Sequence, residues 1–237
     1  MNRRTSLFLL LFTLSTHLSR AEDVTLDQAK AAFAKADATL NATYQRAKTS
    51  MAEWAFAELQ QDQREWIESR DLRAEMAAAY DGRAEEGKEK LAVEYWTTLD
   101  ILTAERTRIV NGWINHDKFS HEWEGVWLDG NGGLLRIMQN EAGKFVFVLD
   151  VVRGPTYHVG NIGGAATWNG STARFTTESL VDETETWLTF IKRQIKLEVI
   201  GENTSGHHGA RAYFDGDYVR VSELSETDRE EILSPGV

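Results

Sequence analysis

Histidines are the first residues to consider for chemistry, because their side chains bind metals and transfer protons near neutral pH. His116 and His121 flank a change in composition, and His158 stands alone. His207 and His208 are adjacent within a Gly-Ser-rich stretch. Zinc needs three or four converging ligands, and neighbouring histidines seldom both reach one ion. The pattern therefore favours solvated loop histidines and predicts no metal site.

Carboxylates offer two further kinds of site. The segment Asp129-Gly-Asn131-Gly-Gly133 begins like a calcium-binding loop, but its twelfth position is Asn140, where a bidentate glutamate is required. A hairpin turn explains this spacing better. Carboxylate pairs are too common in so acidic a chain to indicate a glycosidase. No phosphate loop, nucleophile elbow or helical zinc-protease motif is found. We therefore expect a non-enzymatic protein without a cofactor.

Two polar clusters lie within otherwise amphipathic helical segments. The first reads Asp37-x-x-Leu40-Asn41-x-x-Tyr44, and the second reads Gln63-x-x-Trp66-Ile67-x-x-Arg70-Asp71. Spacings of three and four place each cluster on or beside the packed face of its helix. Arg70 and Gln63 should therefore face the first helix. A buried guanidinium must be paired, and Asp37 is the expected partner of Arg70.

These clusters, DATLNATY (37–44) and QREWIESRD (63–71), resemble the signature of the LprI-like N-terminal domain of lysozyme inhibitors. That signature is roughly D-x-x-L-N-x-x-Y followed by Q-x-x-W-[IL]-x-x-R-D, and the resemblance covers residues 25–80. The family commonly has a cysteine three residues after the Arg-Asp pair, where this chain has Ala74 and no cysteine anywhere. The resemblance implies an exported protein that binds a lysozyme-type muramidase, or a module that is reused for a similar target in the cell envelope. The signature residues are expected to form scaffold between helices rather than a contact surface.

The elements that must hold these residues change near His116. Before it, glycine is rare and Ala, Glu, Lys and Arg dominate, whereas Gly, Thr and β-branched residues dominate after it. We predict a first helix from a Thr25 cap to about Thr49, and a second that begins with a capping box at Ser50–Glu53. A third runs from about Glu85 to Ile114. Together they predict an antiparallel three-helix bundle.

From Glu122 onward the hydrophobic period is two. Phe145, Phe147 and Leu149 alternate with Val146 and Val148, and turn signals recur at short intervals. We predict about eight short antiparallel strands closed or nearly closed into a barrel, which makes the fold class α+β with two domains. The opening segment, Trp123–Trp127, is similar to the W-x-G-x-W start of small lipocalin-like barrels. Such a barrel is either filled by side chains or able to hold one small ligand.

The N-terminus predicts export. Two arginines precede the apolar run Ser6–Ser15, and Ser19-Arg20-Ala21 has the small-x-small pattern of a signal-peptidase site. We expect a signal peptide at 1–21, a helical domain at 22–118, a barrel domain at 119–222 and an acidic tail, frayed or a short turn, at 223–237. No cysteine follows the apolar run for lipid attachment, and no later segment predicts a membrane span. The protein should be periplasmic or secreted, and without disulfides.

Charge indicates the kind of partner. Removal of residues 1–21 leaves 23 Lys and Arg against 37 Asp and Glu, a formal charge of −14. Such a surface disfavours nucleic acid and anionic lipid and attracts cationic proteins, although acidity also serves solubility. The leading hypothesis is a protein that occludes the cleft of a basic lysozyme, with Asp215 and Asp217 at a predicted hairpin tip as candidate contacts. The alternative is a carrier of a small apolar ligand in the barrel.

Overall fold

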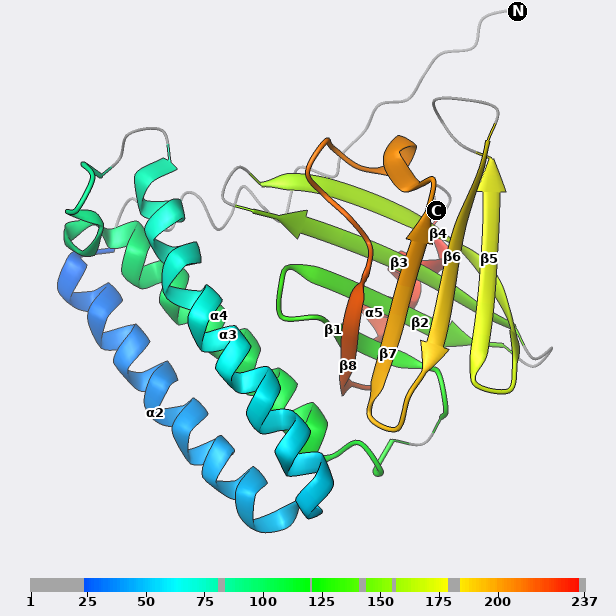
Figure 1. The fold of residues 1–237 in the computed structure, drawn as a ribbon, viewed down its shortest axis with the longest axis horizontal. Helices are drawn as coiled ribbons and strands as arrows, with labels where there is room; N and C mark the ends of the chain where they lie inside the picture. Colours follow the sequence, from blue (N-terminus) through cyan, green and yellow to red (C-terminus); the bar gives the residue numbers. More distant parts are fainter. Residues whose placement is uncertain are drawn as a thin grey trace, which may run out of the picture.

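The computed structural model describes residues 24–80, 84–119, 121–140, 144–154, 157–178 and 184–234. The expected signal peptide lies outside these ranges. Figure 1 shows a group of long helices beside a β-barrel. Within the described ranges, no helix combines the length and apolar character that a membrane crossing requires.

The helical part contains α2 (Leu26–Ser50), α3 (Glu53–Ala79), the 3-10 helix η2 (Glu89–Leu91) and α4 (Val93–Ile114). These four helical segments replace the expected three helices. The third expected helix is shorter than predicted because Gly87 has a φ of 79°, a left-handed conformation that ends α-helical geometry.

One helix start was predicted correctly and one was not. Thr25 caps α2 in a capping box with Gln28, as expected. The capping box expected at Ser50 is wrong: α3 begins after Ala52, without a side-chain cap. Ser50 is the last residue of α2, and its hydroxyl donates a hydrogen bond to the Arg46 carbonyl.

The strands form a closed antiparallel barrel in which each strand pairs with its neighbours in sequence and β8 pairs with β1. The predicted barrel of eight antiparallel strands is confirmed. The strands are β1 (Gly125–Leu128), β2 (Gly133–Gln139), β3 (Lys144–Arg153), β4 (His158–Asn169), β5 (Thr172–Glu178), β6 (Glu185–Lys192), β7 (Lys196–Glu202) and β8 (Gly216–Ser222), with the 3-10 helix η3 (Thr204–His207) between β7 and β8.

Aromatic and aliphatic side chains fill the inside of the barrel. Phe147 lies at its centre, with ring centroids 5.1 Å from Phe175 and 5.0 Å from Phe190. A second aromatic group lies near Trp123, which precedes β1. The half-buried ring of Trp168 stacks with the rings of Trp123 and Phe145, which are tilted against each other. The same cluster includes buried residues from every strand of the barrel. The tryptophans therefore serve as core, and the interior is packed rather than hollow.

A second core joins the helices to the barrel. It combines Trp113 of α4 and Leu59 of α3 with Val219 of β8 and Ile195, and all four are buried. Gly112 permits the close approach of α4 to β8, because a Cβ at this position would lie 2.2 Å from the Arg220 carbonyl oxygen. Because this core is shared, the division at residues 118 and 119 into two domains stays a prediction.

Arg220 ties the last strand to the segment that opens the barrel. Its guanidinium donates hydrogen bonds to the carbonyls of His121 (2.7 Å), Glu124 (2.6 Å) and Glu122 (3.2 Å). It also lies 5.1 Å from the ring centroid of Trp127. The Trp123–Trp127 segment is thus held where the barrel closes.

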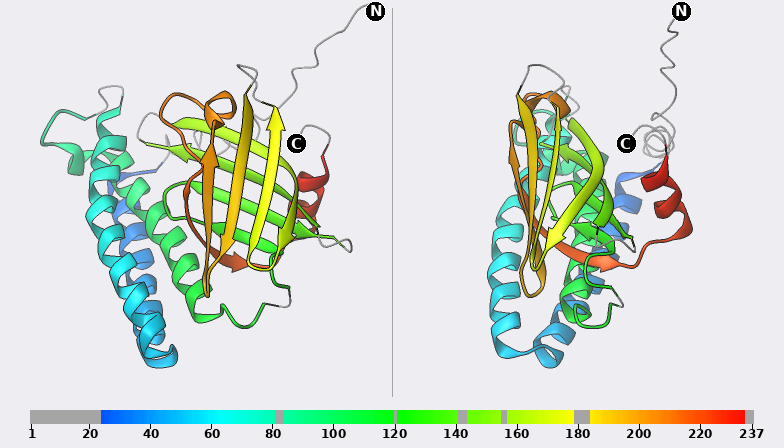
Figure 2. Two further views of the ribbon diagram at one scale, coloured as in Figure 1. Left: turned by 45° about the vertical axis from the view of Figure 1, so that its right-hand side comes forward. Right: turned by 90° about the vertical axis from the view of Figure 1, so that its right-hand side faces the viewer.

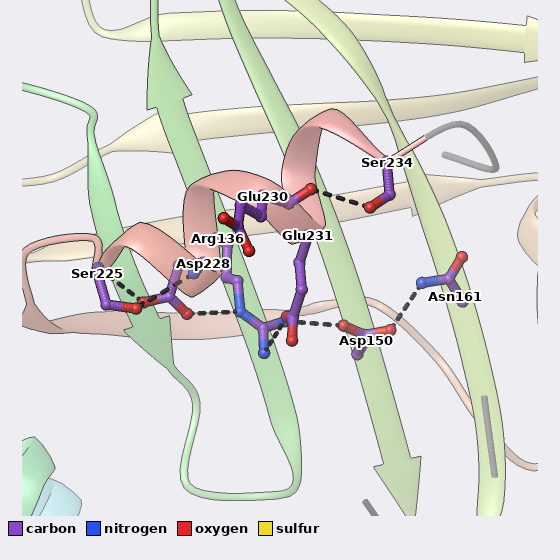
Figure 3. A network of polar contacts seen from close by, with 8 residues as sticks. All are labelled: Arg136, Asp150, Asn161, Ser225, Asp228, Glu230, Glu231 and Ser234. Atoms are coloured by element: carbon purple, nitrogen blue, oxygen red, sulfur yellow. Dashed lines mark hydrogen bonds and ion pairs between the residues drawn. The ribbon is translucent and has the colours of Figure 1, made fainter. Parts of the chain in front are cut away.

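Up to residue 234, where the described part of the chain ends, the segment after β8 is mostly helical, so the expected frayed tail or short turn is wrong for these residues. It contains α5 (Glu226–Leu233), which begins with a capping box at Ser225 and lies on the side of the barrel away from the long helices (Figure 2). Arg136 of β2 joins Asp228 and Glu231 of α5 (both 3.0 Å) to Asp150 of β3 (3.1 Å), as Figure 3 shows. Beneath α5, Ile232 packs with apolar residues of the outer barrel face.

Candidate functional site

A groove runs between α3 and strands β7 and β8. α4 packs against α2, α3 and β8, whereas α3 has few contacts with the barrel. The separation leaves a hollow of about 660 Å³ between α3 and the barrel. Its lining includes Glu58, Gln61, Asp62 and Glu65 of α3, Asp129 and Asn131 of the β1–β2 turn, Lys196, Glu198, Val199 and Ile200 of β7, and Tyr213, Asp215, Gly216 and Asp217 at the start of β8. We call this hollow the acidic groove.

Local structure explains why the carboxylates face one another. On α3, spacings of three and four place Glu58, Asp62 and Glu65 along one side of the helix. On the barrel, Glu198 of β7 is the cross-strand partner of Asp217 of β8, so their side chains leave the same face of the sheet. The groove thus has an acidic wall on each side.

Some of these carboxylates are neutralised within the protein. Asp62 pairs with Arg106 at 2.7 Å, Glu198 with Arg193 at 2.5 Å, and Asp217 with Lys196 at 3.3 Å. Each pair uses a cation from a different element. The groove carboxylates are therefore compensated unevenly along its length.

Other groove carboxylates have no cationic partner among the described residues: Glu58, Glu65 and Asp215. Glu65 accepts a hydrogen bond from Gln61 (2.6 Å), and Asp215 accepts one from the Gly201 amide (3.1 Å). These neutral donors leave the negative charges uncompensated. They are the part of the groove that would gain most from a cation.

A buried ion pair supports two of the residues that line the groove, Asp129 and Tyr213. Arg153 and Asp129 pair at 2.5 Å, and both side chains are almost fully buried. The guanidinium also donates to the Tyr213 carbonyl (3.1 Å) and lies 4.4 Å from the Tyr213 ring centroid. Burial, followed by the charge of Asp129, raises the pKa of Tyr218 far above its ordinary value. Its protonated hydroxyl donates to the Phe214 carbonyl at 3.0 Å, so this region is a rigid support.

Asp215 and Asp217, the contacts predicted from the sequence, both line the acidic groove. The hairpin tip predicted for them is wrong, because Asp215 immediately precedes β8 and Asp217 lies within it. A long connection with η3 joins β7 to β8 in place of a tight turn. Their role as binding contacts stays a prediction.

The first signature cluster lies on α2. Leu40 is buried, and Tyr44 packs against Phe56 of α3 at a ring-centroid distance of 5.4 Å. Asn41 is exposed and donates a hydrogen bond to Asp37 at 2.9 Å. These contacts lie between or beside helices and outside the residues that line the acidic groove.

Asp37 and Arg70 do form an ion pair, but a long one. Their closest atoms are 3.8 Å apart, and the Asp37 side chain is 40% exposed. Arg70 is nearer to its neighbour Asp71, at 2.8 Å. The predicted pair of Asp37 and Arg70 between α2 and α3 is thus confirmed, although the guanidinium is only partly buried and is shared with Asp71.

Gln63 and Trp66 face α4 instead of the first cluster. Gln63 accepts a hydrogen bond from Arg106 at 2.7 Å, and Arg106 is buried. Trp66 is also buried, with the guanidinium carbons of Arg70 and Arg106 5.3 and 5.6 Å from its ring centroid. Arg106 was missed because its partners lie over forty residues away and belong to no continuous motif. Its one sequence signal is a charge on the apolar face of α4.

Of the remaining candidates, Asp129 and Asn131 line the acidic groove, whereas the paired histidines do not. His207 is the last residue of η3, and His208 follows it with its ring against that of Phe214. Asp129 accepts hydrogen bonds from the amides of Asn131 and Gly133, which is turn geometry. No group of His, Asp or Glu within the described ranges is arranged to hold a metal ion.

Comparison with known proteins gives one result for the helical part. Residues 19–108 match the family model described as lysozyme inhibitor LprI. The match includes both signature clusters and most of α4, but it covers less than half of the chain and none of the barrel. It confirms the resemblance drawn from residues 25–80 and extends it into α4. Neither the curated proteins nor the solved structures gave a match.

Proposed function

We propose that this protein, whose N-terminal part is LprI-like, binds a basic lysozyme-type muramidase through the acidic groove and blocks its cleft without catalysis. The observation that carries the proposal is the pair of facing acidic walls, one on α3 and one on β7 and β8. α3 lies within the segment that matches the inhibitor family. The barrel supplies the second wall, so both parts of the chain contribute to one surface.

The charges favour this partner over other macromolecules. In the part of the chain that the structure describes, seven carboxylates and one lysine line the groove. The expected mature chain as a whole is strongly acidic. A basic protein would be attracted from a distance and would find uncompensated carboxylates at Glu58, Glu65 and Asp215. Nucleic acid and anionic membranes would be repelled by the same field.

The structure gives no support to the alternative of a ligand carrier. Phe145, Phe147 and Phe190 lie fully buried at the centre of the barrel, and other buried side chains surround them. A ligand could enter only if several of these residues moved. The packed interior instead gives the barrel the stiffness that a binding wall requires.

The proposal includes export through the signal peptide expected at residues 1–21. Translocation, followed by cleavage after Ala21, would release the mature protein into the compartment where muramidases act. The intact mass of protein from the periplasm or medium should correspond to a chain that begins at Glu22. Recovery of the uncleaved chain from the cytosol alone would contradict export.

A muramidase assay tests the binding surface. Purified mature protein should slow cell-wall hydrolysis by a basic lysozyme, and Glu58→Lys with Glu65→Lys should abolish the effect. The control is Glu178→Lys with Glu230→Lys, which changes the net charge equally at exposed positions on β5 and α5. Equal inhibition by both double variants would show that the groove is not the contact surface. No inhibition by the unaltered protein would refute the inhibitor proposal.

A further inference from the structure

Among the described residues that line the acidic groove, Lys196 of β7 is the one cation. Its ammonium nitrogen lies 3.3 Å from an Asp217 oxygen and 5.4 Å from the ring centroid of Trp113. Its side chain is 22% exposed, whereas that of Asp217 is 52% exposed. The protein thus holds a cation of its own against an exposed carboxylate of the groove.

Lys196 also marks the junction of two hollows. It lines the acidic groove and the neighbouring hollow of about 850 Å³, in which Lys192 and Arg193 lie. In that second hollow the cations are paired, Lys192 with Glu122 and Arg193 with Glu198. Glu58, which has no cationic partner among the described residues, lines both hollows, whereas Glu65 and Asp215 line only the acidic groove. A cationic partner would therefore meet more uncompensated charge in the acidic groove.

On the basis of the proposed function, we infer that Lys196 determines which cationic side chain the groove accepts, by competing with the partner for Asp217. An arriving cation must displace the Lys196 ammonium from Asp217. A partner lysine offers the same single ammonium contact and gains little. An arginine can bind a carboxylate through two parallel N–H donors, so it displaces Lys196 more readily. The groove therefore selects arginine over lysine.

The choice of variant follows from the contacts of Lys196. Lys196→Met keeps an unbranched side chain over Trp113 and removes the ammonium group. Lys192→Met is the matched control, because it removes an equal charge from an ion pair outside the acidic groove. Thermal unfolding of both variants checks that the barrel is intact. A change confined to Lys196→Met then reports on competition in the groove rather than on net charge.

Titration calorimetry with hexa-arginine and hexa-lysine peptides tests the inference. The unaltered protein should bind hexa-arginine more tightly. Lys196→Met should bind both peptides about two- to fivefold more tightly, the size expected for removal of one partly exposed ion pair. The gain should be larger for hexa-lysine, so the preference for arginine should shrink. Lys192→Met should keep the preference of the unaltered protein.

The outcomes separate this inference from the proposed function. If both peptides bind but Lys196→Met leaves their affinities or their ratio unchanged, Lys196 is not a competitor and the inference is wrong. Inhibition of a basic lysozyme would still support the proposed function in that case. If neither peptide binds to the unaltered protein or to Lys196→Met, the inference is refuted and the groove is not a site for cationic side chains.

Discussion

At the scale of single residues, two arginines flank Trp66 in different ways. Arg106 is buried and bonded to Asp62 and Gln63, whereas Arg70 is partly exposed and bonded mainly to the adjacent Asp71. Both guanidinium groups lie near the same indole ring. The stability of the helical part should therefore depend more on Arg106, although the sequence signature includes only Arg70.

We predict that Arg106→Ala lowers the free energy of unfolding by about 2–3 kcal/mol, because it leaves Gln63 without its donor and Asp62 without its counter-ion. Arg70→Ala should cost about 1 kcal/mol or less, since water reaches Asp37 and Asp71. Urea denaturation of the two variants measures both quantities. A larger loss for Arg70→Ala would contradict this ranking.

Part of this set of contacts between the helices could be predicted from the sequence. The spacing of the two clusters correctly placed Leu40 and Trp66 in the core and brought Asp37 near Arg70. It could not show that Gln63 faces α4, because helical periodicity gives the side of a helix but not which neighbour covers it. Arg106 was hidden for the same reason.

At the scale of elements, the close packing of α4 against β8 depends on Gly112. Alanine normally favours a helix by about 1 kcal/mol over glycine. A Cβ here would clash with the Arg220 backbone, which has no flexible end that could move away. We predict that Gly112→Ala destabilises the protein by about 1–3 kcal/mol in thermal or urea unfolding. An increase in stability would show that the helices and barrel are less closely packed.

The attachment of α5 should depend on pH. Burial alone would raise the pKa of Asp228, but hydrogen bonds from Ser225 and the charge of Arg136 outweigh it and lower that pKa. Ionised Asp228 therefore stabilises the fold above its unfolded pKa of about 3.9, and this contribution is lost as pH falls through the lower folded value.

Asp228→Asn tests this dependence. Near neutral pH the variant should be less stable than the unaltered protein, and the difference should shrink as the pH falls below about 4. Near neutral pH, hydrogen exchange at the backbone amides of residues 226–233 should be faster in Asp228→Asn than in the unaltered protein. A stability difference that stays constant down to acidic pH would show that Asp228 does not hold α5 by its charge.

Elements with a strong periodic signal were predicted well, and those defined by long-range contacts were not. The alternation around Phe145–Leu149 identified the barrel, and the Thr25 cap identified the start of α2. By contrast, α5 is short and acidic, and it is held by ion pairs from Asp228 and Glu231 to Arg136 on the distant strand β2. The loss of helix near Gly87 depends on a backbone conformation that the amphipathic pattern does not reveal.

At the scale of the whole molecule, the acidic groove exists only because the helices and barrel are assembled. Glu58 and Asp217 are far apart in sequence and line one hollow because α4 packs against both α3 and β8. Charge patterning and a turn signal led to Asp215 and Asp217. The opposite wall on α3 had no separate signal, since acidic residues on a helix surface usually mean only a solvated face.

Binding kinetics with a purified basic lysozyme test the central claim, that the acidic groove is the contact surface, most directly. The association rate should fall as salt rises, because the whole acidic surface attracts the enzyme. Asp217→Lys and Glu230→Lys change the net charge equally, so each should slow association slightly, but only Asp217→Lys should also raise the dissociation rate. Equal dissociation rates for these variants, or no detectable binding at micromolar concentration, would contradict the account.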